Sequence, residues 1–224
     1  MSHLSLNQNN FKDHYNNKNE VYGISKTRME KILQLFGDAK NRKILDVGCG
    51  EGHLGKIFVD NGHNVYGVDI SDKSIEIAKK VLYEAVCVDM QKENLPYKDD
   101  FFDVIILGEV VEHLLLPEKI LLEIKRVLKN NGFIIITTPN FLVFSNRIKI
   151  LMGKFEYTES GFLDRGHIHF FHIDSFKKMI ESLGLKVDAF NNVYYGRVPE
   201  FIARIWPKSF TYQIVAKVSK KQLC

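Results

Sequence analysis

The feature that most constrains the fold is a series of short apolar runs that alternate with amphipathic helical patterns. The runs occupy residues 43–47, 64–69, 84–89, 102–108 and 133–139. Residues 133–139 have almost no polar face, which is typical of a strand that is covered on both sides. The segments between the runs carry helical patterns, so the sequence predicts a parallel sheet with helices on both faces.

Capping residues set the ends of the predicted helices. In residues 27–37 the apolar positions recur at offsets of three and four, and Gly37 is a plausible stop. Ser71 is expected to cap the helix at 71–80. Pro117 opens a helix that we expect to end before Gly132. Asp174 is expected to cap the helix at 173–184. Two final strands are predicted at 186–195 and 211–219, with one short helix at 198–209 between them.

The chain of 224 residues suits one domain. We expect residues 1–25 to form a flexible segment or lid, and residues 26–224 to form a single domain. Residues 141–170 interrupt the alternation of strands and helices. An insertion of this length usually carries function, so it is the expected substrate segment or lid.

Composition excludes several classes of protein. The net charge of +4 is mild and gives no strong signal for nucleic-acid binding. No run of eighteen apolar residues is present, and the polar start lacks the apolar stretch of a signal peptide. The three cysteines, Cys49, Cys87 and Cys224, are scattered. We therefore expect a cytoplasmic protein without a disulfide framework or a cysteine metal site.

A glycine-rich turn follows the first apolar run, in "ILDVGCGEGHLG" at residues 44–55. Strand, glycine turn and helix together cradle an anionic ligand. A Walker-type loop is excluded because no Gly-Lys-Ser/Thr follows. One register, from Gly50 to Gly55, matches a dinucleotide fingerprint, with Asp69 on the ribose. The other register begins at Asp46 and continues through Gly48 and Gly50.

The second register resembles motif I of class I S-adenosylmethionine (SAM) methyltransferases. "VYGVDIS", "CVDMQ", "FFDVIILGEVVEHL" and "VLKNNGFIIITTPN" resemble the later motifs of that family, in the order that its fold requires. The resemblance implies a Rossmann-like, doubly wound α/β sheet of seven mostly parallel strands, with an antiparallel last strand. It implies SAM as cofactor and S-adenosylhomocysteine as product. The implied cofactor-binding residues are Asp46, Gly48, Cys49, Gly50, Asp69, Ile70, Asp89, Met90 and Gly108.

Two stretches narrow the resemblance. "GEVVEHL" and "GHIHFFHIDSFKKMIESLGLKV" resemble ubiquinone-type O-methyltransferases and small methyltransferases of polysaccharide pathways. The implied reaction is O-methyl transfer to a small molecule, either a sugar or polysaccharide precursor or a quinone-like phenol. N-methylation of a small amine and a non-catalytic binding module are the alternatives.

A hydroxyl nucleophile benefits from a general base near the carboxyl ends of the strands. His113 follows the fourth predicted strand and is the first candidate. His167 and His169 share a face if their segment is extended, and they form the second group. His172, near the next helix start, is expected to be structural.

Glu109, Glu112 and His113 lie at helical offsets of three and four, and His167 would complete a metal-binding set. This set resembles the metal site of small-RNA 2′-O-methyltransferases. Metal-free ubiquinone-type methyltransferases carry the same Glu-x-x-Glu-His turn, so we expect no metal. A metal-assisted RNA 2′-O-methyltransferase is kept as an alternative.

Two apolar stretches with interleaved basic residues lie at 141–155 and 201–206. They suit a lid over the substrate or a partner contact, which we favour, and also a peripheral membrane contact. The oligomeric state is left open.

Overall fold

The computed structural model describes residues 20–21, 24–157, 163, 166–194 and 199–222. Seven strands form one sheet in the order β5-β4-β3-β6-β7-β10-β8, and β9 pairs with β10 outside this path. β3 to β7 pair in parallel, whereas β10 runs antiparallel to both β7 and β8. The predicted sheet is confirmed, with β9 as an eighth, two-residue strand. The strands are β3 (Lys43–Val47), β4 (Asn64–Asp69), β5 (Glu84–Cys87), β6 (Phe102–Gly108), β7 (Leu128–Pro139), β8 (Leu185–Phe190), β9 (Val193–Tyr194) and β10 (Thr211–Lys220).

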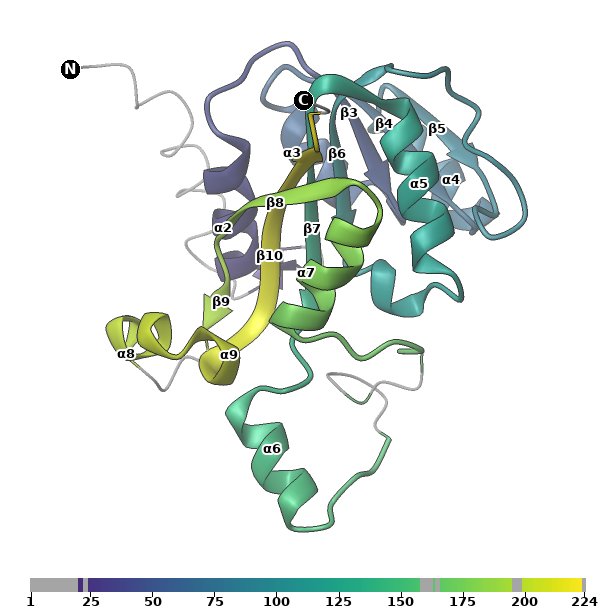
Figure 1. Ribbon diagram of the computed structural model, residues 1–224. Helices are drawn as coiled ribbons and strands as arrows, with labels where there is room; N and C mark the ends of the chain where they lie inside the picture. The colour runs from purple at the N-terminus through teal and green to yellow at the C-terminus, as the bar shows by residue number, and fades with distance from the viewer. Residues whose placement is uncertain (1–19, 22–23, 158–162, 164–165, 195–198, 223–224) are drawn as a thin grey trace, which may run out of the picture.

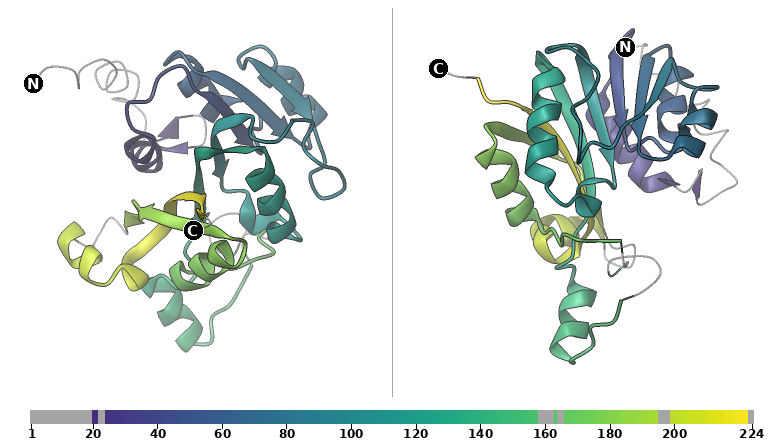
Figure 2. Two further views of the ribbon diagram at one scale, coloured as in Figure 1. Left: turned by 45° about the horizontal axis from the view of Figure 1, so that its top comes forward. Right: turned by 90° about the vertical axis from the view of Figure 1, so that its right-hand side faces the viewer.

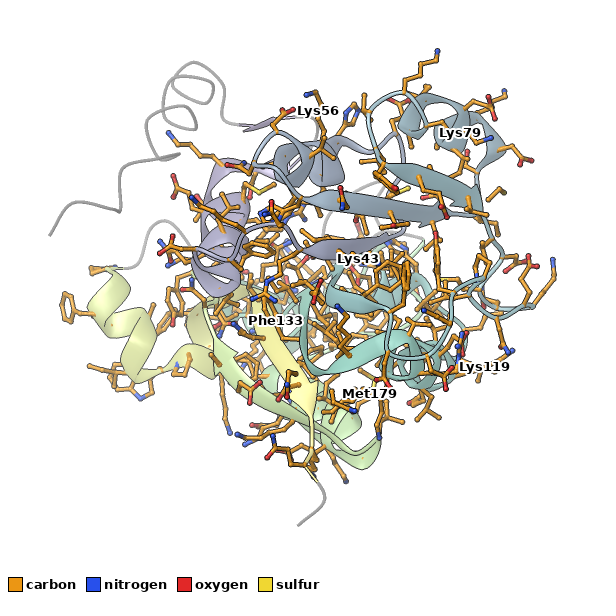
Figure 3. All side chains as sticks on the ribbon, turned by 90° about the horizontal axis from the view of Figure 1, so that it is seen from above. Lys43, Lys56, Lys79, Lys119, Phe133 and Met179 are labelled. Atoms are coloured by element: carbon orange, nitrogen blue, oxygen red, sulfur yellow. The ribbon has the colours of Figure 1, made fainter. Side chains whose placement is uncertain are left out.

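Helices cover both faces of the sheet (Figures 1 and 2). α2, α3 and α4 lie on one face, and α5 and α7 lie on the other. Viewed from above in Figure 3, Lys56 of α3 and Lys79 after α4 lie on the opposite side of the sheet from Met179 of α7. The helices are α2 (Lys26–Phe36), α3 (His53–Val59), α4 (Asp72–Ala78), the 3₁₀ turn η1 (Val111–His113), α5 (Pro117–Val127), α6 (Phe144–Leu151), α7 (Ile173–Ser182), α8 (Glu200–Ile205) and α9 (Pro207–Phe210).

Each strand divides its apolar side chains between two cores. Ile44 packs with α2 and α3, while its neighbour Leu45 packs with α5 on the opposite face. Val104 and Ile105 of β6 alternate in the same way. Successive side chains of a strand point to opposite faces, so a run without a polar face is stable only between two helix layers.

Several predicted ends are confirmed. Gly37 caps α2 with φ of 77°, and its N–H donates to the Leu33 carbonyl. Ser71 caps α4, and its hydroxyl accepts from the Ser74 N–H. Two-residue strands β1 (Glu20–Val21) and β2 (Ile24–Ser25) pair ahead of α2. The rest of the segment predicted to be flexible or a lid, apart from these four residues, lies outside the described residues.

Two predicted helix ends were wrong. α5 ends at Val127 rather than near Gly132, because Leu128 pairs with Phe102 and is fully buried in the sheet. Asp174 does not cap α7. His172 does, and its N–H donates to Ser175 Oγ at 3.0 Å.

Two elements near the C-terminus are divided. The strand predicted at 186–195 splits into β8 and β9, because Asn192 Oδ1 accepts the N–H of Val215 in place of a ladder partner. The helix predicted at 198–209 splits at Trp206, because Pro207 disfavours helical backbone in the residue before it.

α6 belongs to the predicted insertion and follows β7 after four residues. It projects away from the carboxyl ends of the parallel strands (Figures 1 and 2). The chain returns at 166–172, where the Phe141 N–H donates to the Phe171 carbonyl at 2.8 Å. No helix in the described ranges is both long and apolar enough to cross a membrane.

Candidate functional site

The glycine turn between β3 and α3 has three residues with positive φ, namely Gly48, Gly50 and Gly52. A Cβ on Gly48 would lie 2.7 Å from Val110 Cγ2, and one on Gly52 would lie 2.9 Å from Val81 Cγ2. A Cβ on Gly50 would meet nothing within 4 Å. Gly50 therefore faces the open side of the turn, where a ligand can approach the backbone.

The next strand holds this turn in place. The N–H groups of Gly48 and Cys49 donate to the Val68 carbonyl at 2.8 and 3.1 Å. The Gly50 N–H donates to Asp69 Oδ2 at 2.8 Å, and the Ser71 N–H donates to Oδ1 at 2.9 Å. The Asp69 carboxylate is thus oriented by two backbone groups at the mouth of the turn.

Asp46 and Cys49 lie beneath the turn rather than on its open side. Asp46 is 2% exposed, and burial raises its pKa to about 7, with Asp69 adding to the rise and the Gly55 N–H opposing it. Gly55 is a packing position, because a Cβ there would lie 2.7 Å from Leu82 Cδ2. Burial also raises the pKa of the Cys49 thiol, which makes it unreactive.

The other predicted cofactor residues continue along the same edge of the sheet. Asp69 and Ile70 stand at the end of β4, Asp89 and Met90 follow β5, and Gly108 ends β6. Ile70 is 64% exposed, so it offers apolar surface to a ligand. The pKa of Asp89 is lowered by its hydrogen bond with Lys92, at 2.8 Å. The nine predicted cofactor residues therefore follow the carboxyl ends of four adjacent strands.

A strained glutamate joins the ends of β6 and β7. Glu109 has φ of 59°, a conformation that costs of order 1–3 kcal/mol in a non-glycine residue. Its N–H donates to the Thr137 carbonyl and hydroxyl, both at 3.1 Å, and the Thr137 hydroxyl donates to Glu109 Oε1 at 2.8 Å. Arg28 of α2 lies 3.6 Å from Oε2. Thr137 and Arg28 were not among the residues predicted from the sequence. The threonine pair that ends β7 was a usable signal, whereas nothing local marks Arg28.

Glu112 is a buried carboxyl group on η1. It is 1% exposed, and its Oε2 accepts from the Thr138 hydroxyl at 3.0 Å. Oε1 has no hydrogen-bond partner among the described residues. Burial, followed by the nearby charge of Glu109, raises the pKa of Glu112 to about 8. The group is therefore mostly neutral at pH 7 in the folded protein.

The backbone of Glu112 also binds the segment that carries two of the predicted histidines, His167 and His169. Its carbonyl accepts from the N–H groups of Ile168 and His169 at 2.8 and 3.1 Å. The rings of His113 and His167 have centroids 4.8 Å apart. The predicted candidate bases from two distant segments therefore meet beside η1.

Hydrogen bonds define the orientation of two of these rings. His113 Nδ1 lies 2.9 Å from the Gly166 carbonyl, and His169 Nε2 lies 3.3 Å from the Leu115 carbonyl. A carbonyl only accepts, so Nδ1 of His113 carries the proton, and the lone pair of the neutral ring is on Nε2. His113 is exposed, which suits a base that must reach a substrate.

Three of the four residues in the predicted metal set lie together. Glu112, His113 and His167 each offer one potential metal-ligand atom, and these three atoms lie within 4.8 Å of one another. Glu109 is not part of this group and is instead engaged with Thr137. The geometry offers one buried carboxyl oxygen and two imidazoles.

The strand order, the antiparallel β10 and the glycine turn with its strand-end acids define the class I SAM-dependent methyltransferase fold. A family model described as a methyltransferase domain matches residues 22–189. The chain belongs to this methyltransferase family.

Similar structures and relatives agree with this class. A SAM-dependent methyltransferase from Archaeoglobus fulgidus has a TM-score of 0.63 at 21% identity, over 94% of this chain and 98% of that one. The chain is 30% identical over 128 residues to a ubiquinone biosynthesis O-methyltransferase from Bordetella avium, which covers 54% of this chain and 52% of the relative. A protein of the same name from Pelagibacter ubique is 37% identical over 118 residues, covering 49% and 47%. The chain spans about half the length of the curated relatives that it matches.

Proposed function

We propose that the protein transfers the methyl group of SAM to a hydroxyl group of a small-molecule acceptor. The observation that carries this proposal is the anchored Asp69 and glycine turn on the same sheet edge as the His113–His167 pair. The printed name of the relatives, ubiquinone biosynthesis O-methyltransferase, supports oxygen as the methylated atom.

The residues present fit SAM. The open space at Gly50 admits a ligand against the backbone, and the oriented Asp69 carboxylate would accept from the two ribose hydroxyls. Asp89 would meet the adenine amino group, between the apolar side chains of Ile70 and Met90. Gly48 and Gly108 would line the pocket, while Asp46 would support the turn from below. When bound, SAM supplies a methyl group on an activated sulfonium.

His113 would act as the general base. Its Nε2 lone pair, set by the Nδ1 contact with Gly166, would take the proton of the acceptor hydroxyl. His167 lies beside it as the second candidate, and His169 would position the segment through Leu115. Alignment of the hydroxyl group with the methyl group and exclusion of water would account for the rest of the rate acceleration.

Calorimetry with SAM, followed by transfer assays on phenols and sugar nucleotides, tests the proposal. We expect SAM binding, and a loss of about 10²–10⁴-fold in kcat for His113→Ala with phenol or sugar hydroxyls. An unchanged His113→Ala rate on an amine acceptor would favour N-methylation, because an amine needs little beyond positioning. No SAM binding would instead support a non-catalytic module.

A metal-assisted RNA 2′-O-methyltransferase is the second candidate. The grouping of Glu112, His113 and His167 favours it. It requires activity on RNA that is abolished by a chelator and restored by Mn²⁺ or Mg²⁺. The small-molecule proposal requires full activity in the chelator.

The setting that we propose is polysaccharide precursor or quinone biosynthesis in the cytoplasm. Free thiols at Cys49 and Cys87 are compatible with a reducing compartment. Assays with both acceptor classes distinguish the two pathways.

A further inference from the structure

α6 presents its apolar side chains to solvent and a polar one to the body of the protein. Its buried residue is Asn146, whose Nδ2 donates to the Phe141 carbonyl at 2.9 Å. Phe144, Ile148 and Leu151 follow one another at offsets of four and three and are 52%, 38% and 83% exposed. Every residue from 147 to 157 is exposed. This is the reverse of the usual arrangement of a surface helix.

α8 repeats the arrangement, and α9 lies between α8 and α6 in Figures 1 and 2. Phe201, Ile205 and Trp206 are 68%, 64% and 60% exposed, whereas Ala203 is buried. More than half of the exposed large hydrophobic side chains in the described ranges lie within residues 144–157 and 201–212. We call residues 144–155 and 201–208 the docking face.

Contacts join α6 to α9, which carries Lys208 of the docking face and follows α8 along the chain. The rings of Phe144 and Phe210 have centroids 6.0 Å apart, and Arg147 Nη2 donates to the Lys208 carbonyl at 3.1 Å. Figures 1 and 2 show α9 at the start of β10, with α8 and α6 on either side of it at the same end of the molecule. The apolar side chains therefore act from one end rather than as scattered surface residues.

Basic residues surround these apolar side chains. Arg147, Lys149 and Lys154 are exposed within residues 147–157, where Glu156 is the single acidic residue. Lys208 is also exposed and pairs with Asp174 at 2.8 Å. We propose that the docking face binds an anionic lipid bilayer. Apolar side chains enter the headgroup boundary, Trp206 lies at the interface, and the cations meet the lipid phosphates.

Charge favours a bilayer over a second copy of the chain. A twofold contact between two docking faces would bring Arg147, Lys149 and Lys154 of both copies together, and like charges at an interface are unfavourable. An anionic membrane surface instead attracts each lysine or arginine by about 1 kcal/mol. The docking face also reaches toward the candidate site, because the ring of Phe155 has its centroid 6.5 Å from that of Phe170, the residue after His169.

Vesicle co-sedimentation of the full chain tests the proposal. We expect binding to phosphatidylglycerol-containing vesicles and much weaker binding to pure phosphatidylcholine. Leu151→Ser combined with Trp206→Ser should lower the partition coefficient more than about tenfold, from lost apolar burial. Lys149→Gln combined with Lys154→Gln should lower it by about thirtyfold, and added salt should also weaken the binding.

Matched controls lie on other surfaces. Leu122→Ser changes an exposed side chain of α5. Lys56→Gln with Lys79→Gln changes two exposed lysines on the face of the sheet that α3 and α4 cover, as Figure 3 shows. These variants should bind as the wild type does. SAM binding by every variant separates loss of docking from loss of the fold or of the proposed function.

Three results would overturn the proposal. The first is no wild-type binding to either vesicle. The second is equal loss in the control variants. The third is a dimer in light scattering that Leu151→Ser dissociates, without vesicle binding, since that would make the face an interface between copies.

Discussion

Replacing Glu112 with Gln tests whether a neutral carboxyl group lies under the site. The pKa of Glu112 rises from 4.5 to about 8 on folding, because the carboxylate is desolvated beside Glu109. The folded state therefore holds a proton that the unfolded state releases between these two pH values. By linkage, wild-type stability falls as pH rises through this window, by about 1.4 kcal/mol per pH unit. Above the folded pKa, the free energy of unfolding of the wild type is therefore lower by about 3–6 kcal/mol than it is below the unfolded pKa.

Gln is a matched replacement because its amide keeps an acceptor for Thr138 and has no charge to desolvate. The free energy of unfolding of Glu112→Gln minus that of the wild type should rise from about pH 5 to about pH 8 and then level off. The raised pKa of Asp46 is common to both proteins and cancels in this difference.

Urea melts at several pH values, with a chelator present, measure the difference. A metal on Glu112 would hold the carboxylate charged, so the chelator removes that alternative. A difference that stays flat across the pH range would refute the reasoning, since it would mean that folding does not raise the pKa of Glu112.

Three further predictions concern the glycine turn and its surroundings. Asp69→Ala should weaken SAM binding by at least tenfold in calorimetry while the protein stays folded; wild-type affinity would count against the assignment of the ribose site. Gly48→Ala should lower the free energy of unfolding by about 1–3 kcal/mol, because its Cβ meets Val110 at a positive φ, whereas Gly50→Ala should cost less stability and chiefly reduce SAM affinity. In peptide mapping after alkylation near neutral pH, the exposed Cys87 should react before the buried Cys49, and the reverse order would mean that the turn opens.

Local patterns were sufficient for most of the fold. The apolar runs predicted the strands, and Gly37 and Ser71 predicted helix ends, because these signals act over a few residues. Failures came where a distant strand competed with the local pattern. Leu128 continues the helical pattern of α5 but pairs with Phe102, and its burial in the sheet outweighs one more helical turn.

The sequence by itself indicated the class of protein, because the motifs around Asp46, Asp69 and Asp89 resemble those of class I SAM methyltransferases and occur in the order that this fold requires. The tertiary structure decided the hydrogen-bond partners and the burial of the side chains in the candidate site. The Gly166 contact that sets the tautomer of His113 spans 53 residues, and the bond between Thr137 and Glu109 spans 28. Whether Glu112 is buried and Leu151 exposed depends on which elements pack over each residue. Residue types and spacing cannot specify such packing, because it is set by the summed contacts of distant segments.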